Sequence, residues 1–192
     1  SIGGNNIGIV LQGNFDEKRI DEITSKDLSQ IKSKDINYLN SFVDNILATI
    51  AGYENDLFGL LEQYYSLYTL GITFNHIFVK SLPNLGLCDH VTFISKDDAI
   101  PSFRIELDSP FKKVIATAIS KRFNIAMARA IERFKKAHIM NAPQVILLDL
   151  FHLLQAEDLD GIHPTIGGQV KIAQYQEERM DFDIFPRGRR GQ

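Results

Sequence analysis

Two short apolar runs, each preceded by a long stretch with helical periodicity, most constrain how this chain can fold. The first run spans 72–79 and contains β-branched and aromatic residues, and the second spans 144–150. Both have the length of strands that are buried on both faces. Because parallel strands are joined by helical crossovers, the sequence predicts an α/β protein with a parallel sheet covered on both sides.

The helical pattern before the first run extends from 36 to 70, with apolar residues at three- and four-residue steps. Gly52 is expected to divide it into two helices, and Gly71 is expected to end the second one. Three tyrosines in this second helix belong either to the core or to the lining of an acyl pocket: Tyr64, Tyr65 and Tyr68.

The pattern before the second run is the clearest helix in the sequence. It starts after Ser109-Pro110, an N-cap followed by the first helical position, and continues to Phe134. One stripe carries its apolar residues: Phe111, Val114, Ile115, Ala118, Ile119, Phe123, Ala126, Met127, Ala130, Ile131 and Phe134. The cationic residues, Lys112 among them, are expected to lie off this stripe.

The other segments are less regular. Residues 13–35 are polar and predict a loop with a short helix, and 88–110 predict an irregular stretch that forms a rim or lid beside a site. Residues 165–173 predict the start of another helix. A flexible tail is expected at 181–192.

Composition restricts the class of protein. At 192 residues and 44% hydrophobic residues, the chain is long enough for one domain with a core of its own. The net charge of −3 gives no electrostatic reason to expect nucleic acid as a partner. The single cysteine, Cys88, excludes an internal disulfide and a cysteine-based zinc site, and is expected to be a small buried residue. The sequence contains no apolar run of about 18 residues, so it predicts no transmembrane segment.

The stretch Asp160-Gly161-Ile162-His163-Pro164 carries the strongest chemical signal. An aspartate three residues before a histidine, with a glycine between, lets the carboxylate reach the imidazole across a turn. That contact would fix the tautomer of His163 and stabilise its protonated form, as in a Ser-His-Asp triad. A surface turn with a capping aspartate fits the same spacing.

A second signal lies at the amino end. Ser1-Ile2 has the character of the end of a buried strand, and Gly3-Gly4-Asn5-Asn6 follows it as a turn. Together with Asp160 and His163, Gly3-Gly4-Asn5 resembles two conserved blocks of the SGNH, or GDSL, serine esterases and lipases, with Asn6 where that family usually has Asp. The segments 78–86 and 145–149 are also similar to the family, whereas its nucleophile and oxyanion-glycine blocks are not found.

The resemblance implies a flavodoxin-like three-layer α/β/α sandwich with a parallel sheet, of which the N-terminal part is missing. Residues 1–180 would be the C-terminal portion of one SGNH hydrolase domain. The implied partners are an ester or lipid substrate and the missing N-terminal segment or a complementary chain. The long helices before 78–86 look most like the lipase and acylhydrolase branch.

The implied reaction is ester hydrolysis through an acyl-serine, with the serine supplied by a segment outside this chain. His163 would be the general base and Asp160 would orient it. Asn5 would donate to the oxyanion, while Gly4 and Asn6 would contact the substrate. The resemblance implies no metal and no organic cofactor.

An alternative from another class is a degenerate SGNH module that binds without catalysing. Ser109 is not expected to be the nucleophile, because Ser109-Pro110 begins a helix and stands in the wrong order for the family. His76 is expected to be a strand histidine with a local partner, and His90 a substrate contact.

Overall fold

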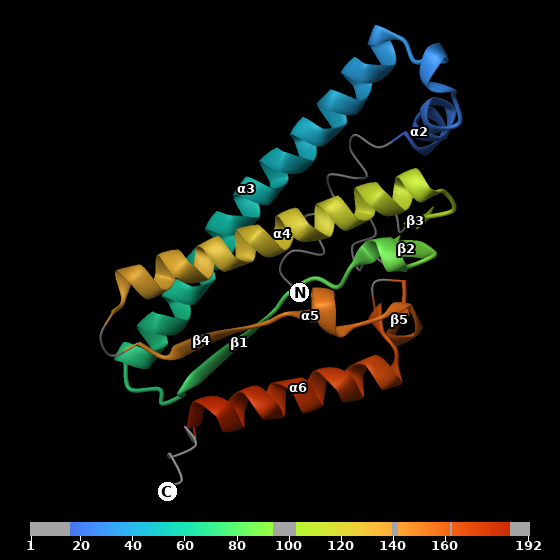
Figure 1. The fold of residues 1–192 in the computed structure, drawn as a ribbon. Helices are drawn as coiled ribbons and strands as arrows, with labels where there is room; N and C mark the ends of the chain where they lie inside the picture. The colour runs from blue at the N-terminus through green and yellow to red at the C-terminus, as the bar shows by residue number, and fades with distance from the viewer. Residues whose placement is uncertain (1–15, 94–102, 140–141, 162, 185–192) are drawn as a thin grey trace, which may run out of the picture.

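The computed structural model describes residues 16–93, 103–139, 142–161 and 163–184. Within these ranges the chain is mostly helical and contains short strands (Figure 1). The elements, in chain order, are α2 (Glu17–Thr24), η1 (Leu28–Gln30), α3 (Ser33–Thr69), β1 (His76–Lys80), η2 (Leu85–Leu87), β2 (His90–Phe93), β3 (Phe103–Glu106), α4 (Pro110–Ala137), β4 (Gln144–Leu148), α5 (Leu150–Leu153), η3 (Ala156–Asp158), β5 (Leu159–Asp160), β6 (His163–Pro164) and α6 (Ile166–Ile184).

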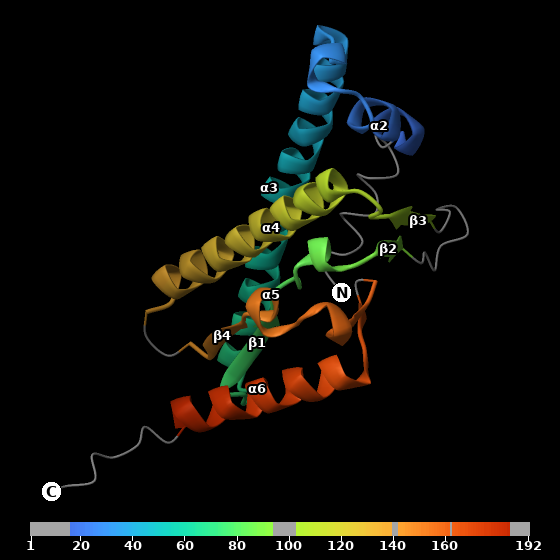
Figure 2. The ribbon, with the colours of Figure 1, turned by 45° about the vertical axis from the view of Figure 1, so that its right-hand side comes forward.

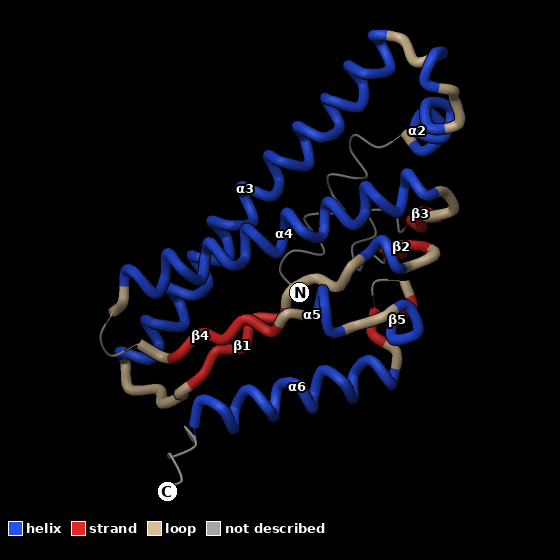
Figure 3. Tube along the Cα trace, viewed as in Figure 1, coloured by secondary structure: helices blue, strands red, loops and turns tan. Residues whose placement is uncertain are grey.

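Strands β1 and β4 form a two-stranded parallel sheet (Figure 3), with a register from His76↔Gln144 to Lys80↔Leu148. Helix α4 lies between them in sequence and makes the crossover that parallel pairing requires. The protein is therefore a mixed α/β structure, as the sequence predicts. β1 begins four residues later than the expected strand, since Ile72 lies exposed in the turn after α3.

The sheet is packed on both faces. Figures 1 and 2 show α3 and α4 on one side of β1 and β4 and α6 on the other. Successive residues of a strand point to opposite faces. Accordingly Val145 packs in the cluster of α3 and α4, whereas Ile146 and Leu148 pack against Ile172 of α6.

Helix α3 is one continuous helix of 37 residues, so the expected break at Gly52 is wrong. The Gly52 Cα is exposed, and a glycine in a helix costs only about 1 kcal/mol relative to alanine. Packing along α4 outweighs that cost: Tyr53 and Phe123 bring their rings within 5.3 Å. The stop at Gly71 is confirmed, because Gly71 adopts a φ of 92° directly after the C-cap.

Helix α4 begins as expected, since the Ser109 hydroxyl accepts a hydrogen bond from the Lys112 backbone N–H and Pro110 is the first helical residue. Two expectations about its faces are wrong. Val114 is exposed although it belongs to the apolar stripe. Lys112 is buried rather than solvated, because its ammonium pairs with Asp21 at 2.6 Å and with Asp108 at 3.0 Å. These pairs join α2 to the start of α4.

Two segments differ from what the sequence predicts. Residues 88–110 contain an antiparallel pair, β2 with β3, where an irregular stretch was expected. Helix α6 extends to Ile184 and so passes the expected start of the tail at 181; the rest of that tail lies outside the described residues. Among the described helices, none is long and apolar enough to cross a membrane.

Candidate functional site

The carboxyl ends of β1 and β4 are tied together by Ser81. Its backbone N–H donates to the Leu148 carbonyl at 2.9 Å, and its buried hydroxyl accepts from the Leu150 backbone N–H at 2.8 Å. Open α/β sheets bind ligands at this end of the strands. The segments that follow Ser81 and Leu148 therefore form the frame of the candidate site.

The segment after β1 is fixed to α4 by polar side chains. The Asn124 amide exchanges two hydrogen bonds with the backbone of Leu82, at 2.8 and 2.9 Å. The Ser120 hydroxyl accepts from the Leu85 N–H at 3.2 Å. Gly86 lies so close to α4 that an added Cβ would overlap Thr117 and the carbonyl of Lys113. The loop after β1 is therefore held closely against α4.

Asp160 and His163 are direct partners in the antiparallel pair of β5 and β6. Their side chains are both exposed, with an exposed fraction of 82% for Asp160. The expected hydrogen bond between them is not made in the structure, although both residues are described. The Asp160 carboxylate instead lies 3.9 Å from Nε2 of His90.

Asp158 anchors this hairpin to α6. Its buried carboxylate accepts from Lys171 Nζ at 2.7 Å and from the Gln155 N–H at 2.9 Å, and both bonds lower the pKa of Asp158, that of Lys171 more. Its carbonyl accepts from the Thr165 N–H at 2.8 Å. Thr165 in turn caps α6 by accepting from the Gly168 N–H. The helix expected to start within 165–173 is confirmed as α6, and these bonds anchor the hairpin to it.

Cys88 holds the other side of the hairpin. Its thiol is buried, as expected, and donates to the Gly161 carbonyl at 2.7 Å. Burial, and to a lesser degree the charge of Asp89, raises the pKa of the Cys88 thiol to about 11. A neutral thiol is a donor and a poor nucleophile, so Cys88 has a structural role here.

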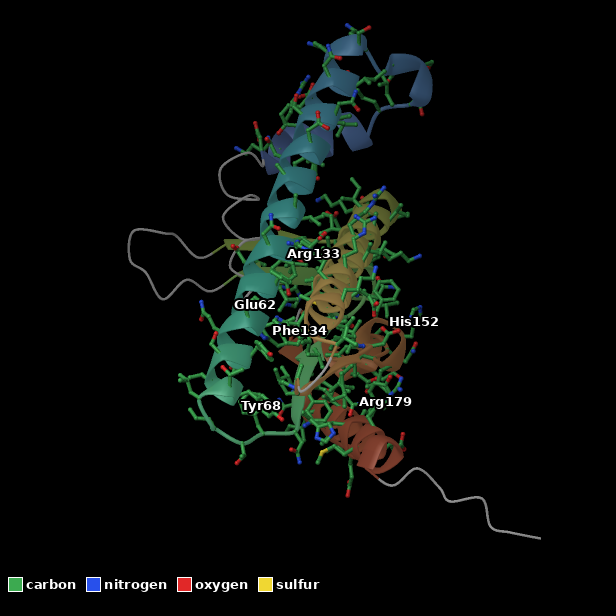
Figure 4. All side chains as sticks on the ribbon, turned by 90° about the vertical axis from the view of Figure 1, so that its left-hand side faces the viewer. Glu62, Tyr68, Arg133, Phe134, His152 and Arg179 are labelled. Carbon is green, nitrogen blue, oxygen red and sulfur yellow. The ribbon has the colours of Figure 1, made fainter. Side chains whose placement is uncertain are left out.

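A second Asp-x-x-His pair, absent from the sequence-based site, follows β4 directly. Oδ2 of Asp149 lies 2.7 Å from Nδ1 of His152, and Oδ1 accepts from the Phe151 N–H at 3.1 Å. The His152 side chain is 78% exposed and lies on the opposite side of the molecule from α3 (Figure 4). The same spacing as in Asp160–His163, directly after an apolar run, was the signal that could have revealed it.

A groove of about 530 Å³ runs along β1 beneath α3. Tyr64 lines it and packs edge-on to Phe74, so one of the tyrosines faces a hollow rather than the core. The other two pack on neighbouring rings, Tyr65 on Phe134 and His138, and Tyr68 on Phe74 (Tyr68 and Phe134 are labelled in Figure 4). His76 also lines the groove and stacks near Phe78.

Gly4, Asn5 and Asn6, which are expected to contact the substrate and the oxyanion, lie outside the described residues. Ser109 serves as the helix cap. Among the described residues, no group of three or more His, Cys, Asp or Glu side chains could hold a metal ion. Comparisons with protein-family models, with curated proteins and with solved structures find no match to this chain.

Proposed function

We propose that this chain is the C-terminal portion of a carboxylic ester hydrolase of the SGNH type, with the three-layer fold of that family. The direct pairing of Asp160 with His163 across a short, exposed hairpin carries the proposal. Such a pair, beside the carboxyl ends of parallel strands, suits proton transfer to a bound substrate. The blocks at Gly3-Gly4-Asn5 and Asp160–His163 support the same function.

In this mechanism His163 takes the proton of a serine hydroxyl, and the serine oxygen attacks the ester carbonyl carbon. Asn5 donates a hydrogen bond to the resulting oxyanion. His163 then gives its proton to the leaving alcohol, and an acyl-serine remains. Water, deprotonated by His163, then attacks the acyl carbon; the bond to the serine oxygen breaks, His163 returns its proton to that oxygen, and the carboxylic acid is released. Asp160 orients His163 and stabilises the imidazolium, which requires one oxygen of its carboxylate to come into contact with the His163 ring.

The serine comes from a segment outside these 192 residues, because no serine of this chain matches the nucleophile block of the family. The substrate is a carboxylic ester or lipid, in keeping with the resemblance to the lipase and acylhydrolase branch. No organic cofactor takes part in these steps.

The test compares the two Asp-x-x-His pairs in the complete protein, with p-nitrophenyl esters as substrates. Asp160→Asn is expected to lower turnover by up to about 10⁴-fold, as in serine proteases. Asn5→Ala should cost about 10²–10³-fold. Asp149→Asn and His152→Ala are matched controls with the same spacing, and should leave turnover nearly unchanged. A large loss in the controls alone would assign the base to His152.

The chain alone should show little esterase activity, since His163 has no serine to activate. Fluorophosphonate labelling should appear only when the upstream segment is supplied, fused or as a separate chain. Labelling of the 192-residue chain that is lost in Ser109→Ala would contradict this assignment.

The alternative is a non-catalytic binding module of the same family. One observation favours this alternative. The structure describes both Asp160 and His163, yet the Asp160 carboxylate lies near His90 and makes no hydrogen bond with His163. A complete protein that takes up no fluorophosphonate, yet binds an ester lipid, would support this alternative.

A further inference from the structure

The hairpin that carries Asp160 rests on the segment from Cys88 to His90. The Cys88 thiol donates to the Gly161 carbonyl. A Cβ added at Gly161 would lie 3.3 Å from His90 Nε2, so the imidazole packs directly against the turn. Gly161 has a φ of 58°, which disfavours any larger residue there. The position of Asp160 is therefore set by residues about 70 positions earlier in the chain.

His90 is much more buried than Asp160. Its side chain is 19% exposed, and it begins β2, where it pairs with Glu106 of β3. The backbone on both sides is held, since the Leu107 N–H donates to the Asp89 carbonyl at 2.7 Å. The exposed Asp160 carboxylate can rotate about its side-chain bonds, so it can turn to accept a hydrogen bond from the imidazole N–H.

The other carboxylates near His90 have cationic partners of their own. Asp89 pairs with Lys113 at 3.1 Å, and Glu106 pairs with Arg104 at 2.6 Å. Asp160 is thus the carboxylate to which the His90 ring is directed, with 3.9 Å between Nε2 and Oδ1. This geometry makes Asp160 the carboxylate partner of the His90 ring.

We propose that His90 is a positioning residue that holds one oxygen of Asp160 and thereby presents the other to His163. The inference rests on the proposed function of that pair. Directly opposed residues of antiparallel strands project from the same face, so Asp160 and His163 are neighbours. A carboxylate has acceptor capacity for an N–H from each imidazole. His90 then limits the rotation of Asp160 and keeps it in reach of His163.

The first test uses the 192-residue chain and needs no activity. His90→Leu retains bulk without a donor, and His90→Gln retains an N–H donor. In NMR spectra at pH 7, His90→Leu should shift the Asp160 side-chain carboxyl carbon and the His163 ring nitrogens. His90→Gln should restore most of both signals. His152→Leu is the matched control and should leave them unchanged.

A second variant keeps the proposal testable if His90→Leu does not fold. Asp160 is exposed, so Asp160→Asn should fold, and it should shift the ring nitrogens of His90. Unchanged Asp160 and His163 signals in His90→Leu, or an unchanged His90 ring in Asp160→Asn, would overturn the proposal.

The kinetic test uses the complete protein. His90→Leu should lower kcat by about 10- to 100-fold through misplacement of the pair, with KM unchanged, and His90→Gln should recover most of the loss. A rise in KM with unchanged kcat would make His90 a substrate contact and overturn the positioning role. If the complete protein hydrolyses no ester, the proposed function fails, while the NMR result still decides whether His90 holds Asp160.

Discussion

Asp35 shows how a single buried charge is made tolerable. Its carboxylate is fully buried, and it accepts from Arg19 at 2.6 Å, from Lys26 at 3.1 Å and from the Lys32 backbone N–H at 3.1 Å. The Lys32 N–H and then Lys26 lower the pKa of Asp35. The group links α2 to the start of α3, so its ionisation is coupled to folding.

We expect this coupling to appear as acid sensitivity. A lowered pKa in the folded state gives stability that is complete above the unfolded value of 3.8 and is lost as the pH falls below it. Asp35→Asn should therefore lower Tm clearly at pH 7 and little at pH 2. Thermal melts over this range, with the exposed Asp44→Asn of the same helix as control, measure the difference. Parallel curves for wild type and Asp35→Asn would contradict it.

Cys88 gives a second prediction for one residue. With a pKa of about 11, its thiol is almost entirely protonated at pH 8. Its reaction with Ellman's reagent should therefore be at least about 10²-fold slower in the folded protein than in denaturant. Fast labelling of the folded chain would show that the segment under Gly161 opens readily.

At the scale of elements, two glycines at helices have opposite roles. Gly52 lies within α3, and an added Cβ there would meet nothing within 4 Å. Gly52→Ala should therefore raise the free energy of unfolding by about 0.5–1 kcal/mol. Gly86, by contrast, touches α4 at Thr117 and Lys113, so Gly86→Ala should destabilise the protein. Urea denaturation of both variants measures these changes, and destabilisation by Gly52→Ala would indicate that α3 bends there.

At the scale of the whole molecule, the helical layer is wider than the described sheet. Two helices side by side cover about 20 Å, or about four strands, whereas α3 and α4 face only β1 and β4. Among the described strands, none pairs with the edge of β1 that faces away from β4, which lies along the groove below α3.

Hydrogen exchange tests whether this edge is free in the isolated chain. The Ser81 N–H and the Asn75 carbonyl bond to the β4 side, so the amides of the alternate residues His76, Phe78 and Lys80 face away from β4. They should exchange faster than those of Ile77 and Val79. Because a free edge favours strand pairing between molecules, higher protein concentration should protect them and give larger species in sedimentation. Equal protection of both sets in dilute solution would contradict this expectation.

The sequence by itself determined the elements whose patterns are local. The N-cap at Ser109, the stop at Gly71, the buried strand after α4 and the buried cysteine follow from residue type and spacing. Tertiary structure decided what depends on distant partners. Gly52 stays helical because α3 packs on α4, and Lys112 is buried because Asp21 reaches it. Likewise Asp160 lies beside His90 rather than in contact with His163, because the fold packs the segment of Cys88 and His90 against the hairpin.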